Sequence, residues 1–185
     1  MKNLALGTFL AAVAMFLWGF VFFGSAVGSA TFSSITLEQE TALAAALRQN
    51  VPADGTYVLP APFVGNEASF AERMAAGPSA MVHFARAGSP AMDPMLMLKG
   101  FVHMLVTALL LAMLLRRFGG GLSGYGERFR LALLIGVIVA VWANLANPIW
   151  WHQSWQHHGM IALYDLVGIG LAGAVLARFV RPHAT

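Results

Sequence analysis

Residues 4–27 read LALGTFLAAVAMFLWGFVFFGSAV, a run that contains no charged side chain. Such a run is long enough to cross a bilayer, because a spanning helix needs about 20 consecutive apolar residues. Three further stretches have the same character, at roughly Met95–Leu115, Leu131–Trp151 and Gly159–Ala177. The sequence therefore predicts an integral membrane protein with an all-α membrane region of four transmembrane helices.

The composition agrees with a membrane location and narrows the possible chemistry. Of the 185 residues, 58% are hydrophobic and only 10% are charged, whereas soluble domains contain about 25% charged residues. The isoelectric point near 9.8 would suit a nucleic-acid ligand, but the basic residues stand at helix ends and form no single patch, so we predict no nucleic-acid partner. The absence of cysteine excludes disulfides, thiolate metal sites and cysteine nucleophiles.

The first apolar stretch also has features of a secretory signal peptide. Lys2 supplies a basic start, and the small residues of 27–30 offer a cleavage site. The apolar core of about 20 residues is longer than the roughly 7–15 residues of a signal peptide. We therefore interpret residues 1–28 as a retained transmembrane helix.

Lysine and arginine divide unevenly between the two sides that four crossings define. The N-terminus, the Gly-rich connection 116–130 and the tail after the fourth helix together carry seven basic residues and one acidic residue. The segment 29–93 and the adjoining start of the second helix carry four basic and six acidic residues. The positive-inside rule therefore predicts that both termini and a basic loop 116–130 are cytoplasmic. Segment 29–93 would then lie in the periplasm of a bacterium, with the chain in the inner membrane.

Segment 29–93 is too long for a plain loop, and its pattern predicts a small α+β insert. Helices are expected over 36–49 and 67–76, and strands over 56–59 and 79–87. An insert of this size has little core of its own, so we expect it to rest on the outer helix ends or on another protein. An apolar stripe is expected on its first helix, formed by Leu37, Leu43, Ala44 and Leu47.

The first strand of the insert lies in the segment Gly55-Thr56-Tyr57-Val58-Leu59-Pro60. This motif, together with the helix order, resembles small, uncharacterised four-helix inner-membrane proteins of bacteria. Those proteins have a periplasmic insert with a Gly-x-Tyr-Val-x-Pro strand, followed by a three-helix region that corresponds here to residues 94–185. The resemblance implies the fold over most of the chain, and it supplies no activity.

Asp165 is the most unusual residue of the fourth helix. It lies about seven residues inside the helix, roughly 10 Å below the outer surface, where a charged residue is costly and normally faces protein or water. His158 stands seven residues earlier on the same face. Gly168 and Ala172 continue this face with small side chains, which favour close approach of another helix.

Other polar residues are expected at a similar depth. Asn144 belongs to the third helix, whereas Lys99, His103 and Thr107 belong to the second. Together with His158 and Asp165 they are a candidate polar cluster in the outer half of the bundle. One interpretation is a site for an ion, a proton or a small ligand. The other is a set of interhelical hydrogen bonds that order the bundle.

Histidines and methionines also gather at the outer end. Imidazole and thioether groups suit copper, and a facing pair of histidines suits haem iron. The spacings match no closed metal motif, so no cofactor is predicted, and a haem or copper site is the less favoured alternative. The candidate ligands are His103, His157, His158, Met95 and Met97.

The chain contains no Gly-rich phosphate loop, no His-Glu-x-x-His and no Gly-x-Ser-x-Gly, so no enzyme activity is predicted. The favoured function is an accessory or structural subunit of a larger membrane complex. Its partners would be the lipid bilayer and either other membrane subunits or further copies of the chain. The alternative is a small carrier or sensor, single or oligomeric, that uses the polar cluster. A haem- or copper-binding redox subunit is the third possibility.

Overall fold

The computed structural model describes residues 2–118, 122 and 124–180. Within these residues, four helical segments are long and apolar enough to cross a membrane, which confirms that part of the prediction. They are α1 (Lys2–Phe23), α5 (Pro94–Phe118), the continuous run Tyr125–Trp151 and α8 (Trp155–Phe179).

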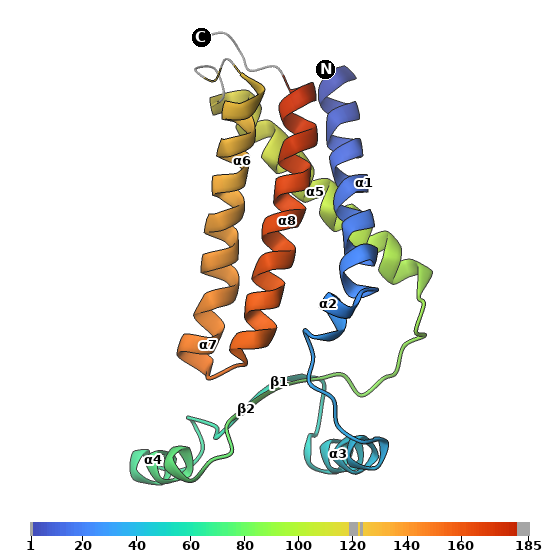
Figure 1. Cartoon of the computed structure of the whole chain (residues 1–185). Coiled ribbons are helices and arrows are strands. Elements are labelled where there is room, and N and C mark those ends of the chain that lie inside the picture. The colour runs from blue at the N-terminus through green and yellow to red at the C-terminus, as the bar shows by residue number, and fades with distance from the viewer. Residues whose placement is uncertain (1, 119–121, 123, 181–185) are drawn as a thin grey trace.

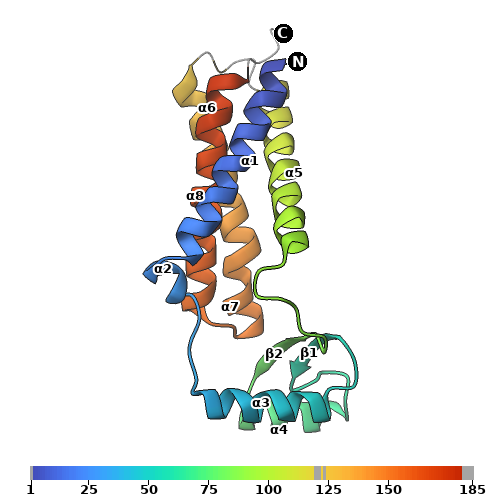
Figure 2. The ribbon, with the colours of Figure 1, turned by 90° about the vertical axis from the view of Figure 1, so that its right-hand side faces the viewer.

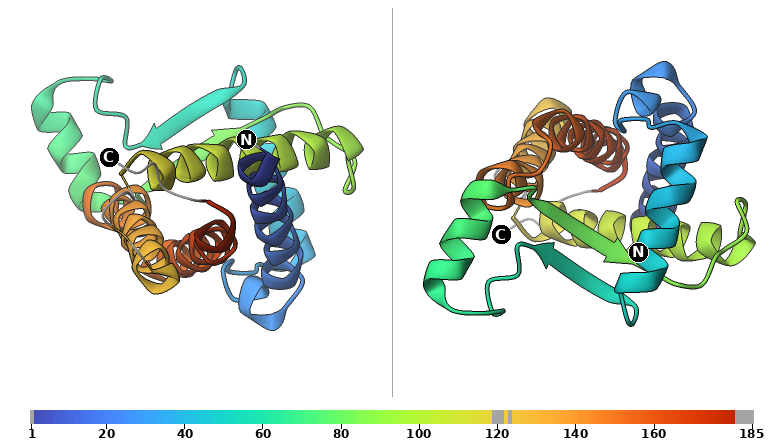
Figure 3. Two further views of the ribbon diagram at one scale, coloured as in Figure 1. Left: turned by 90° about the horizontal axis from the view of Figure 1, so that it is seen from above. Right: turned by 90° about the horizontal axis from the view of Figure 1, so that it is seen from below.

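The membrane-type helices form one bundle, and the insert lies beyond one end of it (Figures 1 and 2). The start of α1, the end of α5, the start of the run Tyr125–Trp151 and the end of α8 lie together at the opposite end. Helix α8 packs mainly on α1 and on the N-terminal part of the third segment, whereas α5 packs mainly on α1. Seen along the bundle axis, α5 crosses the other three helices obliquely (Figure 3).

Small residues bring α8 close to its neighbours. Gly173 lies against Ala132 so closely that a Cβ at Gly173 would overlap the Ala132 methyl group. Gly168 and Ala172 are buried, which agrees with the close approach expected from them. The remaining core consists largely of alanines and leucines from α1, α5 and α8. Close packing of this kind replaces the hydrophobic driving force that water provides for soluble proteins.

The first helix is shorter than predicted, because it ends at Phe23 and not near Val27. The Ser25 hydroxyl donates to the Phe22 carbonyl at 2.7 Å, and Ser25 also caps the short helix α2 (Ala26–Ser29). The chain folds back at this point, since a Cβ at Gly28 would overlap the backbone of Phe22 and Phe23. The glycine is therefore required by a close backbone contact that apolarity alone does not reveal.

The third segment is longer and less regular than the predicted Leu131–Trp151. It begins as α6 (Tyr125–Val139), passes through one π-helical stretch, η2 (Ala140–Leu145), and ends as α7 (Ala146–Trp151). The connection is shorter than the predicted basic loop 116–130, because α5 continues to Phe118 and α6 starts at Tyr125. Residues 119–121 and 123 of that loop lie outside the described residues.

Arg128 connects the start of α6 to the end of α8. Its Nε and Nη2 atoms donate to the Ala177 carbonyl at 3.1 and 2.9 Å, and its Nη1 atom donates to the Leu122 carbonyl at 3.2 Å. A cation at a helix C-terminus satisfies free carbonyls and complements the helix dipole. Arg128, one of the basic residues at this end of the bundle, therefore joins α6 to α8.

The insert contains the predicted elements with small differences at their ends. Helix α3 covers Leu37–Asn50, and α4 covers Glu67–Ala76. The strands β1 (Gly55–Leu59) and β2 (Ala80–Phe84) form an antiparallel pair that aligns Gly55 with Phe84. The second strand is shorter than the predicted 79–87, because β1 offers only five partners and the Arg86 amide instead donates to Asp54 at 2.8 Å.

The insert has almost no hydrophobic core. Neither α3 nor α4 contains a buried residue, and the expected apolar stripe on α3 is largely open. Leu37 is 78% exposed and Leu43 is 53% exposed. In the connection between β1 and α4, Phe63 is 98% exposed. The predicted stripe is thus only partly covered, since Ala44 and Leu47 are half-buried whereas Leu37 and Leu43 are exposed.

Replacing Gly173 by valine is expected to lower the free energy of unfolding by about 1–3 kcal/mol, because the new side chain overlaps Ala132. Gly100→Val is the matched control, since a Cβ at Gly100 meets no atom within 4 Å, and it is expected to change stability by less than about 0.5 kcal/mol. Unfolding of both variants in one detergent, followed by circular dichroism, measures the difference. Equal stabilities would contradict the central role of this contact.

Candidate functional site

Asn144 and Asp165 form the polar contact at the centre of the candidate site. The Asn144 Nδ2 atom donates to the Asp165 Oδ2 atom at 2.8 Å, and Asn144 is only 6% exposed. Asp165 stands ten residues after the start of α8, about 15 Å along the helix axis, which is deeper than the sequence suggested. The structure thus brings together two of the six predicted cluster residues through a direct hydrogen bond.

The position of Asn144 depends on the π-helical stretch that contains it. Pro148 follows within the next turn, and it cannot donate a backbone hydrogen bond to the preceding turn. The Asn147 side chain takes over this role, because its Nδ2 atom donates to the carbonyls of Ala143 at 2.9 Å and Asn144 at 3.5 Å. Single π turns inside α-helices are frequent at functional sites.

His158 is buried near the start of α8, at the end of the bundle that faces the insert. Its Nε2 atom bonds Gln153 Oε1 at 2.6 Å, and the Gln153 Nε2 atom contacts the Met81 sulfur of β2 at 3.2 Å. Among the described residues, the His158 Nδ1 atom has no hydrogen-bond partner. The imidazole therefore helps to join the bundle to the insert, and within the described part of the chain it makes no hydrogen bond to Asp165.

A second connection joins α8 to the segment after α2. The His157 Nδ1 atom donates to the Thr31 carbonyl at 3.0 Å, and the Gln156 side chain donates to the Ala30 carbonyl at 2.6 Å. The rings of His157 and His158 lie edge to face, with centroids 4.9 Å apart. The two adjacent histidines thus bond different segments, since His157 bonds Thr31 after α2 and His158 bonds Gln153 before α8.

The second helix contributes no contact to this site. Lys99 and His103 are exposed on α5, and across the described residues neither side chain makes a hydrogen bond to Asn144, His158 or Asp165. The Thr107 hydroxyl donates within its own helix to the His103 carbonyl at 3.0 Å. The six predicted residues therefore do not form one cluster, because Lys99 and His103 are exposed and Thr107 bonds within its own helix.

The candidate metal ligands are also separated. Within residues 2–118, 122 and 124–180, no group of three or more His, Cys, Asp or Glu side chains is placed to hold a metal ion. Met95 is exposed at the start of α5, and Met97 is half-buried on the same helix. His103 is exposed, whereas His157 and His158 bond the groups described above.

Tyr164 is a site residue that the sequence analysis did not select. Its ring packs against Phe22 and Phe23 with centroids 5.1 Å apart, and it stacks on Trp18. The Trp18 Nε1 atom donates to the Tyr164 carbonyl at 3.0 Å. The ring also borders an apolar crevice of about 340 Å³ between α1 and α5. A signal was present in the sequence, since Tyr164 directly precedes Asp165.

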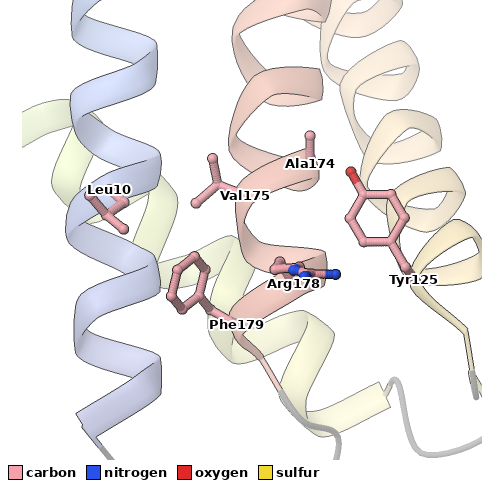
Figure 4. Close-up of a pocket in the computed structure, with 6 residues that line it drawn as sticks. All are labelled: Leu10, Tyr125, Ala174, Val175, Arg178 and Phe179. Atoms are coloured by element: carbon pink, nitrogen blue, oxygen red, sulfur yellow. The ribbon is translucent and has the colours of Figure 1, made fainter.

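A wider cavity of about 690 Å³ lies beside α8 at the opposite end of the bundle. Figure 4 shows Phe179 directed toward α1 and Arg178 at the basic end of α8. The walls are almost wholly apolar, and they are formed by Leu10, Tyr125, Ala174, Val175, Arg178 and Phe179.

Comparisons with models of known protein families, with curated proteins and with solved structures found no match to this chain. Its class is therefore given by the fold and the site alone: a four-span membrane-type helical bundle with an external α+β insert.

Asp165→Asn is expected to preserve stability, because the new side-chain oxygen still accepts the hydrogen bond from Asn144. Asp165→Leu leaves the buried Asn144 amide without an acceptor and is expected to cost about 1–3 kcal/mol. Adding Asn144→Leu to Asp165→Leu removes both polar partners and should recover much of this loss. Detergent unfolding of the three variants tests the pair, and equal losses for Asp165→Asn and Asp165→Leu would show that the charge itself is needed.

Proposed function

We propose that this protein is a non-catalytic accessory or structural subunit of a larger membrane complex, and that the insert is its docking part. The observation that carries the proposal is the lack of a hydrophobic core in α3, β1, α4 and β2. A unit of this size buries too little apolar surface to be stable alone. Contact with another protein outside the membrane would supply the missing burial.

The exposed apolar residues of the insert support a protein partner. Phe63 and Val64 lie side by side between β1 and α4, and both are exposed. Exposed apolar surface of this kind outside the lipid marks interaction sites when it is contiguous. Leu37 and Leu43 add exposed apolar surface on α3.

The connections between the bundle and the insert support the same function. The contact of Gln153 with Met81 and the hydrogen bond from His157 to Thr31 join the outer end of α8 to both ends of the insert region. On the insert itself, Arg86 donates to the carbonyls of Arg48 and Val51 and so ties β2 to α3. A docking surface fixed in this way loses less entropy when a partner binds.

For the orientation, we propose the bacterial inner membrane, with both termini in the cytoplasm and the insert in the periplasm. The arginines at the ends of α5 and α8 and at the start of α6 support this orientation through the positive-inside rule. The bundle places these helix ends together, opposite the insert.

The natural absence of cysteine allows a direct test of the orientation. Phe63→Cys in the insert is expected to react with a membrane-impermeant maleimide in intact spheroplasts. Phe118→Cys, at the exposed end of α5, is expected to react only after the membrane is permeabilised. The reverse pattern would place the insert in the cytoplasm.

The accessory function predicts that a photoreactive amino acid at Phe63 crosslinks to a protein other than this chain in native membranes. The same amino acid at Phe118 is the control at the opposite end of the molecule and should not capture that partner. Native mass spectrometry of the complex purified in mild detergent identifies the crosslinked chain. A crosslink only between two copies of this chain, or a lone monomer at both positions, would contradict the proposal.

The second candidate function is a small carrier or sensor, and the contact between Asn144 and Asp165 favours it. An ionisable residue in the bundle interior is by default a functional-site candidate. In that case Asp165→Asn would abolish activity while the protein still assembles. An absorbance and metal scan of the purified complex tests the haem or copper alternative, for which a Soret band or bound copper is expected.

A further inference from the structure

The crevice between α1 and α5 has the shape and walls of a small-molecule site. Its volume of about 340 Å³ is within the usual range of about 300–1,000 Å³ for such sites. Tyr164 of α8 forms part of its wall. The other main walls are side chains that interact well with flat rings, namely Phe16, Phe20, Phe23, Met97 and Met104.

Tyr164 gives this crevice one polar group. Gly19 faces the phenol closely, since a Cβ at Gly19 would lie 3.4 Å from the Tyr164 hydroxyl oxygen. A larger residue at position 19 would fill the space beside the hydroxyl. No described residue hydrogen-bonds this hydroxyl, whereas the ring itself is held by Trp18 and Phe22. Contacts to the ring and to the backbone carbonyl of Tyr164 thus fix the orientation of this residue. Its hydroxyl group remains able to donate a hydrogen bond to another molecule.

The depth of Tyr164 selects the chemistry of that molecule. The residue stands nine positions after the start of α8, about 13 Å along the helix, and so within the apolar part of a span. An acyl chain has no acceptor for a hydroxyl at this depth, and a buried polar group without a partner is costly. The ester groups of phospholipids lie near the interface. An acceptor for Tyr164 therefore has to be carried on a molecule that dissolves in the hydrocarbon region.

We propose that the crevice binds a membrane-dissolved ring that bears a carbonyl group, the chemistry of a quinone head group. The Tyr164 hydroxyl donates to the carbonyl, and the rings of Phe16, Phe20 and Phe23 and the two methionines contact the faces and edges of the ligand. The apolar tail of such a molecule extends from the crevice into lipid. This binding site goes beyond the accessory function and does not depend on it.

The test is a titration of the purified full chain in lipid nanodiscs with decylubiquinone, followed by tryptophan fluorescence. Trp18 stacks on Tyr164, so a ring bound in the crevice is expected to quench it in a saturable manner. Tyr164→Phe keeps the ring and removes the donor, and it should weaken binding by about threefold to tenfold, as expected for one neutral hydrogen bond. Gly19→Leu should abolish the saturable phase, and Gly126→Leu, on an open face of α6 at the opposite end of the bundle, should leave it unchanged.

The proposal is overturned if quenching rises only linearly with the quinone concentration. A linear rise indicates that the quinone partitions into the lipid without binding in the crevice, which acyl chains would then fill. It is also overturned if Tyr164→Phe binds the quinone as tightly as the unmodified protein. Thermal unfolding of each variant is measured on the same samples. If Gly19→Leu does not fold, the Tyr164→Phe titration decides alone. Binding is measured on the isolated chain, so this result is separate from the crosslinking test of the accessory function.

Discussion

The close approach of α8 to α6, where Gly173 lies against Ala132, is the contact on which the other features of the bundle depend. Helices in lipid gain little from burying apolar side chains against one another, so small residues that allow dense packing are decisive. This contact brings α8 between α6 and α1. From that position α8 can place Asp165 beside Asn144 and Tyr164 beside Trp18, and it can present the Ala177 carbonyl to Arg128.

The polar residues in the half of α8 nearer the insert mostly form hydrogen bonds to other parts of the chain. Asp165 accepts from Asn144, His158 reaches Met81 through Gln153, and His157 bonds the Thr31 carbonyl. The imidazoles of His157 and His158 therefore each have a protein partner. These bonds also connect the insert and the segment after α2 to α8. The accessory and sensor functions differ mainly in whether Asp165 must carry its charge.

Hydropathy, helix caps and turn residues were sufficient to predict much of the fold. The four spans follow from length and apolarity, and the helix expected over 36–49 is present as α3, which Thr36 caps through a reciprocal pair with Gln39. The errors occur where a tertiary contact overrides the local pattern: Gly28 folds back on Phe22, and the third segment passes through a π turn before Pro148. Asp165, which depth and helical face selected in the sequence, accepts a hydrogen bond from Asn144. The rotation of α5 about its axis is set by packing, so the sequence alone could not exclude Lys99 and His103 from the site.

The sequence pointed to Tyr164 only through its position next to Asp165, and the crevice beside it could not be predicted, for a related reason. Tyr164 is one aromatic residue among many near the outer end of the spans, and its hydroxyl becomes distinctive only because Gly19 of another helix lies opposite. The crevice beside it lies in the contact between α1 and α5, on which α5 mainly relies for its packing. Helix α5 is also the element that leads from the insert into the bundle. A molecule bound beside Tyr164 would therefore contact α5, the helix that directly follows the insert in the chain. The proposed ligand site and the proposed docking surface are thus connected through α5.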